Sequence, residues 1–264
     1  MANTTDILEE LTALRRKDAE IREADVPFSE MLARAGHEPA ALDFAAAFRN
    51  PGINVISELK RASPSEGMIR EDFRPAELAR ELEAAGAAAL SVLCEPHRFL
   101  GNEEYLKDAR KATGLPLLYK DFISTPYQIA AARAAGADAV LLIAAVLSGG
   151  ELADLLAFTH KLGMCALVET HDEREIERAA VAGARIIGVN CRNLRNFACE
   201  TSLLETLVGK VPRSCVRIAE SGMHTPEAIR CAKAAGADGF LIGTALMRSP
   251  RPGAKLKELL TTNH

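Results

Sequence analysis

A repeated alternation of amphipathic and uniformly apolar segments organises the chain. Four segments resemble one another, EAAGAAALSVL, RAAGADAVLLI, VAGARIIGV and KAAGADGFLIG, and their glycines are Gly86, Gly136, Gly183 and Gly236. Each segment predicts a helix that ends at a glycine, where no Cβ opposes the left-handed conformation, and then an apolar strand covered on both faces. The glycines lie about 50 residues apart, which fits two strand–helix units of roughly 25 residues each.

Further apolar runs of strand length lie between these segments, at residues 55–59, 115–119, 165–168 and 216–219, so the chain has eight predicted strands. Helical patterns follow most strands, at residues 75–85, 126–135, 150–162 and 226–235, and three of these have proline near the first turn. Eight strands that alternate with helices predict an α/β fold of the closed (β/α)8 type, a TIM barrel.

An open, doubly wound sheet is the main structural alternative, because it shares the alternation of strands and helices. Such a sheet normally carries G-x-G-x-x-G after its first strand, where the backbone approaches a dinucleotide. Here the first strand runs into KRASPSEG, which lacks that pattern. The spacing of the repeat therefore favours the barrel.

About 50 residues precede the first strand, more than a barrel needs. Ile7, Leu8, Leu11 and Leu14 recur at helical spacing, and shorter amphipathic pieces follow. We expect a single (β/α)8-barrel domain over residues 1–264, with residues 1–50 as an N-terminal helical extension, because barrels of about 250 residues share one core. The extension either plugs the barrel or leans over its active-site mouth.

Composition and charge limit the possible partners and location. The net charge of -4 provides no basic face for nucleic acid or anionic lipid. The six cysteines form no C-x-x-C pair, so neither a zinc site nor a disulfide framework is predicted. The N-terminus does not resemble a secretory signal, and the longest apolar run, residues 139–147, is shorter than the roughly 20 residues of a membrane span. We expect a cytoplasmic protein that binds neither nucleic acid nor membrane, and we take it to be a monomer.

Polar residues follow the apolar runs at the predicted carboxyl ends of the strands, where barrels carry their active sites. Taken singly, each charge is more often a solvated loop residue or a rim ion pair. Together, three carboxylates and two lysines at one mouth indicate acid–base chemistry, in which burial and like-charged neighbours lower a lysine pKa and raise a carboxylate pKa. The candidates are Glu58, Lys60, Lys120, Glu169, Asn190, Arg192, Glu220 and Ser221.

Small residues end the last two strands, in AESGMHTP and FLIGTALM, and leave backbone N–H groups free for a phosphate. Asp121 points away from the site if its strand alternates, so we assign it a structural role. Histidines 97, 160, 171 and 224 are interpreted as rim residues, since no second histidine lies at ligand spacing. No H-E-x-x-H or G-x-S-x-G is present, so neither a metal nor a covalent nucleophile is predicted.

Six motifs in order, ISELKRASPSEG, LLYKDFI, ALVETHDE, IGVNCRNL, IAESGM and GFLIGTALM, closely resemble the indole-3-glycerol-phosphate synthase family. The resemblance covers nearly the whole chain, including ILEELTALRRKDAEIREA near the N-terminus. It implies an enzyme of tryptophan biosynthesis that converts 1-(2-carboxyphenylamino)-1-deoxyribulose 5-phosphate to indole-3-glycerol phosphate, with loss of carbon dioxide and water. Neither metal nor cofactor is implied.

The resemblance also implies roles for the candidate residues. Lys120 would protonate the ribulose carbonyl, Lys60 would contact the anthranilate carboxylate and act again in dehydration, and either Glu58 or Glu169 would be the base. Lys120 would need a lowered pKa, which Lys60 would help to produce. The binding residues would be Asn190 and Glu220 for hydroxyls, Arg192 near the carboxylate, Ser221, Gly222, Gly243 and Thr244 for the phosphate, Pro64, Phe99, Phe122 and Leu194 as walls of an aromatic slot, and Ser63 in the first loop.

Several residues depart from the family pattern, and other families share part of it. The departures are Glu66 for lysine, Cys94 for threonine, Asn102 for serine, Asn193 for aspartate and Thr244 for serine, and none removes a proposed proton carrier. Phosphoribosylanthranilate isomerase and the tryptophan synthase α subunit share the loop after the last strand but do not explain KRASPS and LLYKDF together. A noncatalytic barrel would be expected to lose Lys60, Lys120 or Glu169.

Overall fold

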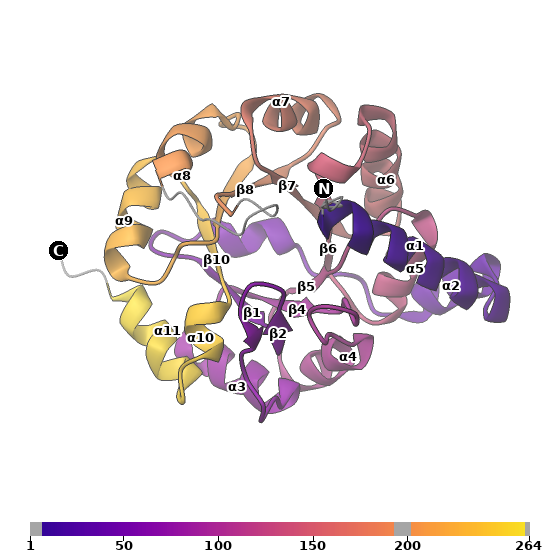
Figure 1. Ribbon diagram of the computed structural model, residues 1–264, viewed down its shortest axis with the longest axis horizontal. Helices are drawn as coiled ribbons and strands as arrows, with labels where there is room; N and C mark the ends of the chain where they lie inside the picture. The colour runs from indigo at the N-terminus through magenta and orange to yellow at the C-terminus, as the bar shows by residue number, and fades with distance from the viewer. Residues whose placement is uncertain (1–6, 193–201, 262–264) are drawn as a thin grey trace, which may run out of the picture.

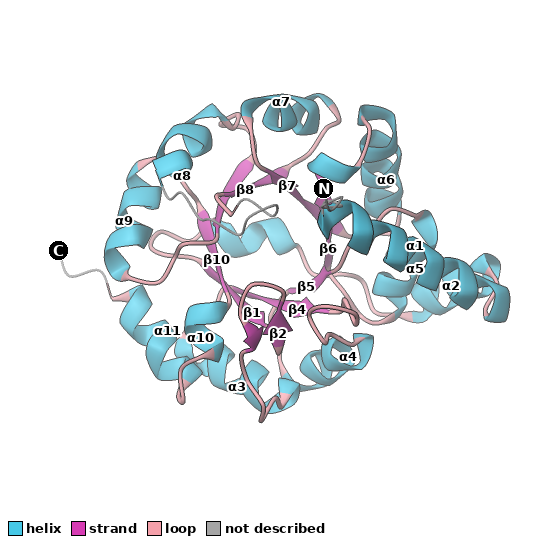
Figure 2. Cartoon of the chain, in the orientation of Figure 1, coloured by secondary structure: helices cyan, strands magenta, loops and turns pink. Residues whose placement is uncertain are grey.

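The computed structural model describes residues 7–192 and 202–261. Over these residues the strands close into a parallel barrel in the order β1-β10-β9-β8-β7-β6-β5-β4, with helices around the outside (Figures 1 and 2). The predicted (β/α)8 barrel is confirmed. The barrel strands are β1 (Val55–Leu59), β4 (Ala89–Leu93), β5 (Leu117–Lys120), β6 (Ala139–Ile143), β7 (Cys165–Thr170), β8 (Ile186–Asn190), β9 (Val216–Glu220) and β10 (Gly239–Ile242).

Helices end at the glycines that the sequence analysis identifies as helix stops. Gly86 and Gly236 adopt φ values of +101° and +107° after their helices, which glycine does without a Cβ clash. The helices are α3 (Pro75–Ala85), α4 (Glu103–Ala112), α5 (Pro126–Ala134), α6 (Gly149–Lys161), α7 (Glu173–Val181), α8 (Ser202–Leu207), α9 (Pro226–Ala234), α10 (Thr244–Met247) and α11 (Pro252–Leu260), with short 3-10 turns η2 (Ala144–Val146) and η3 (Val208–Lys210) and a hairpin of β2 (Ala62–Ser63) and β3 (Gly67–Met68).

Three strands extend one or two residues beyond their apolar runs. They end at Lys120, Thr170 and Glu220, so polar site residues are themselves part of the hydrogen-bonded ladder. Hydrophobicity alone misplaces these ends, because the barrel mouth accepts polar side chains that a closed core would exclude. The extension is useful for function, since strand residues are held more rigidly than loop residues.

The N-terminal extension consists of α1 (Ile7–Asp25), α2 (Phe28–His37) and the 3-10 turn η1 (Phe44–Phe48), and it serves both ends of the barrel. Phe48 of η1 lies against Gly239, the first residue of β10, and so closes the amino-terminal end. At the opposite end, α1 lies across the mouth toward α5 (Figure 1), and Leu8 and Leu11 join the apolar cluster inside the barrel. Within this one extension, η1 therefore closes the amino-terminal end of the barrel, and α1 covers the mouth.

Among the helices of the described residues, none combines the length and apolar character needed to cross a bilayer.

Candidate active site

A cavity opens at the carboxyl ends of the strands and contains the predicted site. It has a volume of about 970 Å³ when counted out into its open mouth. Every predicted site residue in the described part of the chain lines it, whereas Leu194 lies outside the described residues. The lining includes Glu58, Lys60, Ser63, Pro64, Phe99, Lys120, Phe122, Glu169, Asn190, Arg192, Glu220, Ser221, Gly222, Gly243 and Thr244.

Lys120, at the end of β5, lies among three buried carboxylates from other strands. Its Nζ is 3.3 Å from Glu220 Oε2, 3.5 Å from Glu169 Oε2 and 3.9 Å from Glu58 Oε1. The three carboxylate side chains are no more than 4% exposed. Buried charges of this kind are tolerated only when they compensate one another, so the ammonium of Lys120 favours the ionised forms of the carboxyl groups around it.

Lys60 forms the second cationic position of the site. Its Nζ lies 2.8 Å from Glu58 Oε2. Space for this carboxylate comes from Gly243 at the end of β10, because a Cβ at that position would lie 2.1 Å from Glu58 Oε2. Glycine at position 243 is thus required by the packing of Glu58, in addition to the predicted exposure of its backbone.

The predicted fall in the pKa of Lys120 is wrong for this structure. Burial lowers the pKa of Lys120, but the charges of Glu220, Glu169 and Glu58 outweigh burial and raise it well above its ordinary value. The prediction expected a nearby lysine to help lower this pKa, but the Lys60 ammonium pairs with Glu58. Lys120 is therefore an ammonium before substrate binds, and the surrounding carboxylates make release of its proton less favourable than in a solvent-exposed lysine.

The carboxylates divide into two protonation states. Burial raises the pKa of Glu220 to about 8, and the Glu169 charge adds to this increase while Lys120 opposes it. Burial also acts to raise the pKa values of Glu58 and Glu169, but nearby Lys60 and Lys120 for the former, and Lys120 with His171 for the latter, hold both below the ordinary value. Near neutral pH, Glu220 is mainly protonated while Glu58 and Glu169 are ionised.

The raised pKa of Glu220 predicts a pH-dependent stability. The folded chain retains a proton that the unfolded carboxyl, with a pKa of about 4.3, has lost, so this contribution is complete below the unfolded pKa and disappears as pH rises through the folded value. Between these limits it falls by about 1.4 kcal/mol per pH unit. Glu220→Gln cannot titrate, so its melting temperature relative to wild type should rise between about pH 5.5 and 8.5. Parallel pH profiles of the two proteins would contradict the assignment.

The apolar half of the cavity is wider than the predicted slot. Phe99 and Phe122 face each other with ring centroids 6.2 Å apart, and Pro64 also lines the wall. Sequence reasoning missed the apolar residues of β4, β6 and β10 that also line the cavity, although the spacing of two between Leu141 and Ile143 on β6 indicates two inward-facing positions. These residues are Leu93, Leu141, Ile143, Leu241 and Ile242.

Both predicted phosphate loops line the cavity. Ser221 has a positive φ of 68° and its hydroxyl donates to Asn190 Oδ1 over 2.8 Å, which fixes the loop after β9. Thr244 is the first residue of α10, and the position that precedes it, Gly243, makes no side-chain capping bond. Because Gly243 occupies the N-cap position, the Thr244 hydroxyl is not placed where a side chain caps this helix.

Two of the histidines interpreted as rim residues lie at the site itself. His224 lines the cavity, and His171 Nε2 lies 3.5 Å from Glu169 Oε1. The expectation that Asp121 points away from the site is wrong, because Asp121 lines the cavity, where Arg15 of α1 binds its carboxylate. Among the described residues no group of three or more His, Cys, Asp or Glu is arranged to hold a metal ion.

Two departures from the resembled pattern have local explanations. Glu66 pairs with Arg248, so its charge is compensated by a contact between the first loop and the segment after α10. Asn102 caps α4 by accepting from the Glu104 N–H over 2.9 Å, a role that serine also performs. Asn193 lies outside the described residues.

Comparisons with known proteins agree over most of the chain. The family model described as indole-3-glycerol phosphate synthase matches residues 8–259. Indole-3-glycerol phosphate synthase from Azoarcus sp. is 46% identical over 97% of this chain and 99% of its own, and indole-3-glycerol phosphate synthase 2 from Streptomyces coelicolor is 48% identical over 89% and 90%. Among solved structures, 3-hexulose-6-phosphate synthase from Salmonella typhimurium has a TM-score of 0.63 at 14% identity, covering 78% of this chain and 96% of its own, which concerns the fold alone.

Proposed function

The chain belongs to the indole-3-glycerol phosphate synthase family, and from that premise we propose how the residues of its barrel mouth divide the reaction. The enzyme is a carboxy-lyase of tryptophan biosynthesis. Its substrate is 1-(2-carboxyphenylamino)-1-deoxyribulose 5-phosphate. Ring closure, loss of carbon dioxide and loss of water give indole-3-glycerol phosphate.

The observation that carries the proposed mechanism is the Lys120 ammonium among three buried carboxylates beside an apolar slot. When the electron-rich ring attacks the ribulose carbonyl, the carbonyl oxygen must gain a proton, and Lys120 donates it. The carboxyl group then leaves the ring as carbon dioxide, and its bonding electrons restore aromaticity. Lys60 contacts that carboxyl group in the substrate.

Dehydration needs one proton removed from carbon and one delivered to the departing hydroxyl. Lys60 supplies the proton to oxygen. Glu58 and Glu169 are both ionised, so either is chemically competent as the base that takes the proton from carbon. Glu220, whose pKa burial raises to about 8, is neutral and donates hydrogen bonds instead of accepting the proton.

The remaining lining residues hold the substrate in this orientation. Asn190 and Glu220 contact its hydroxyls, while Arg192 lies near its carboxylate. Leu194 is kept as a proposed wall of the slot. The aromatic ring lies between Pro64, Phe99 and Phe122, Ser63 contributes from the first loop, and the phosphate binds Ser221, Gly222, Gly243 and Thr244.

Thr244→Ala is expected to raise KM and leave kcat nearly unchanged. The phosphate is remote from the bonds that change, so its contacts are similar in the ground and transition states. A hydrogen bond to a charged group is worth about 1.5 to 3 kcal/mol, which corresponds to a KM increase on the order of ten- to a hundredfold. Thr244→Ser should be nearly silent. An unchanged KM with a lowered melting temperature would remove Thr244 from the phosphate site.

The assigned activity is tested by mixing purified protein with the carboxyphenylamino-deoxyribulose phosphate and following indole fluorescence. The chain contains no tryptophan, so the background signal is low. Glu169→Gln should keep the fold and reduce the rate. Folded wild-type protein that gives no indole signal would overturn the assignment.

We also propose that residues 1–264 form one domain that acts as a monomer in the cytoplasm, without nucleic acid or membrane. The net charge of -4 supports the absence of nucleic-acid and membrane binding, because it provides no general attraction to nucleic acid or to anionic lipid. Sedimentation of the purified protein measures the oligomeric state directly, and a dimeric mass would contradict the proposal.

A further inference from the structure

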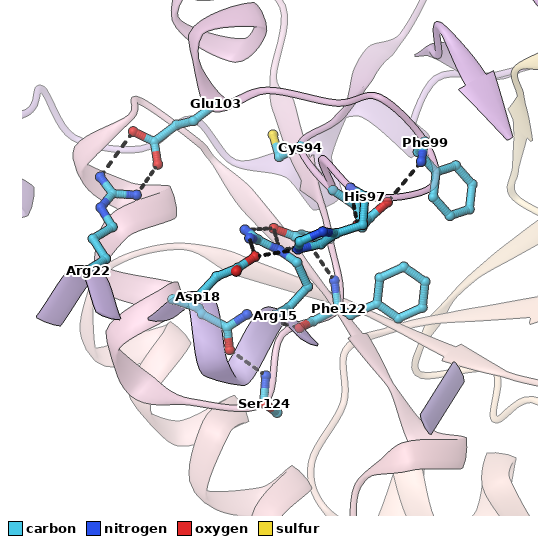
Figure 3. Close-up of polar contacts among 12 residues, drawn as sticks. Arg15, Asp18, Arg22, Cys94, His97, Phe99, Glu103, Phe122 and Ser124 are labelled. Carbon is cyan, nitrogen blue, oxygen red and sulfur yellow. Dashed lines mark hydrogen bonds and ion pairs between the residues drawn. The ribbon is translucent and has the colours of Figure 1, made fainter. Parts of the chain in front are cut away.

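Helix α1 is bound to two separate turns at the barrel mouth through adjacent side chains. The Arg15 guanidinium donates to both oxygens of Asp121, with the closest contact 2.7 Å, and Asp18 lies 2.7 Å from His97 Nε2. Arg15 and Asp18 also bind each other over 2.5 Å. Figure 3 shows these contacts as one continuous polar chain. The helix thus connects the turn after β5 to the turn after β4.

The first end of this chain fixes Phe122. Asp121 is only 2% exposed and accepts the backbone N–H of Phe122 over 2.8 Å. A carboxylate buried to this extent requires a charged partner, and Arg15 supplies it. Arg15 of α1 therefore orients the Asp121 carboxylate, and this carboxylate in turn holds the backbone N–H of Phe122.

The second end fixes Phe99. Fully buried Glu95 accepts the backbone N–H groups of His97 and Phe99, at 2.6 and 2.8 Å, and so shapes the turn after β4. His97 then attaches this turn to Asp18. Burial raises the pKa of Asp18, but the hydrogen bonds from His97 and Arg15 outweigh it and lower the pKa overall, so the carboxylate stays charged.

The two turns carry the aromatic pair of the cavity. The rings of Phe99 and Phe122 lie 6.2 Å apart with a tilt of 42°, and both residues line the cavity. Figure 3 shows the two rings together on one side of the polar contacts. Their separation depends on the distance between the turns, because the rings come from different strands. We propose that Arg15, Asp18 and His97 are positioning residues that set the geometry of the aromatic slot, and thereby the affinity for the ring of the substrate.

The same helix provides a matched control. Arg22 of α1 binds Glu103, the first residue of α4, over 2.7 Å, and Figure 3 shows this ion pair apart from the contacts of Arg15, Asp18 and His97. Asp18 and Arg22 are similarly exposed, at 33% and 39% of their side chains. Replacing either by alanine removes one attachment of α1, but only the Asp18 variant removes the contact with His97 in the turn that carries Phe99. The other ion pair between α1 and this turn, Glu10 with Arg98, is more exposed and remains in both variants. A general loosening of α1 would affect both variants alike.

The first experiment compares Asp18→Ala with Arg22→Ala and rests on the proposed function. Asp18→Ala should raise KM about three- to tenfold, while the inhibition constant of inorganic phosphate, which lacks the ring, stays unchanged. Arg22→Ala should keep KM within about twofold of wild type. Asp18→Asn, which retains an acceptor, should recover part of the affinity. Equal KM values for the two alanine variants, or a parallel loss of phosphate binding, would overturn the proposal.

The second experiment does not require activity. Because the chain has no tryptophan, Phe99→Trp introduces a single fluorescent reporter into the slot. Adding Asp18→Ala should increase its quenching by acrylamide, and adding Arg22→Ala should not. Unchanged quenching with Asp18→Ala would overturn the inference even if the enzyme is active, whereas wild-type protein without indole formation would overturn only the proposed function.

Discussion

Replacement of Lys120 by methionine is expected to lower kcat at least a hundredfold with little change in KM, because general acid catalysis is typically worth about 10² to 10⁴ in rate. The structure adds a second reason for a large effect. Without the ammonium, Glu58, Glu169 and Glu220 lose the cation that they share, so Glu169 would tend to take up a proton and stop acting as a base. Steady-state kinetics with indole detection measures both constants.

Lys120→Arg is the matching variant, because the stability of the cluster must be separated from its chemistry. Removing one member of a buried charged group typically costs about 3 to 5 kcal/mol, and arginine avoids this loss by retaining the charge. Because a guanidinium does not release a proton, Lys120→Arg should also have a low kcat. Its melting temperature should stay nearer to that of the wild type. A normal kcat in this variant, or an effect of the methionine variant on KM alone, would reassign Lys120 to binding.

The barrel and most of the lining could be predicted from sequence, because both depend on local patterns. Apolar runs mark strands, and in a parallel barrel all carboxyl ends meet at one mouth, so Glu58, Lys120 and Glu220 converge despite being far apart in the chain. Their convergence follows from the fold alone, without knowledge of any contact between these side chains. The same reasoning placed Ser221 and Gly243 beside each other from their positions after the last two strands.

The electrostatics could not be predicted this way, because they depend on distances between side chains. Sequence identifies Lys60 and Lys120 as neighbours at the mouth, but not that three carboxylates approach Lys120 while Glu58 takes the charge of Lys60. The direction of the Lys120 pKa follows from that geometry and is opposite to the predicted one. The contacts of α1 were equally hidden, since Arg15 and Asp121 are 106 positions apart and no local pattern pairs them.

Glycine 188 provides a test of how the buried carboxylates are accommodated. It lies on β8 beside Glu169 of β7, and a Cβ there would lie 2.0 Å from Glu220 Oε1 and 3.2 Å from Leu167 Cδ1. Glu220 is 1% exposed, and its other carboxylate oxygen lies 3.3 Å from Lys120 Nζ, so a shift that relieves the clash also changes this contact. A methyl group at position 188 must therefore push Glu220 away from Lys120.

Gly188→Ala is expected to lower kcat by about a hundredfold or more, since misplacement of a catalytic group by about 1 Å costs on that order. Overpacking should also reduce the free energy of unfolding by about 1 to 3 kcal/mol. Gly150→Ala is the control, because a Cβ at that position meets no atom within 4 Å, and it should leave both quantities nearly unchanged. Adding Glu220→Ala to Gly188→Ala removes the clash, so the double variant should regain stability but not activity. Additive losses of stability in the two substitutions, or normal turnover in Gly188→Ala, would show that Glu220 moves freely and that glycine at position 188 is not required for the site.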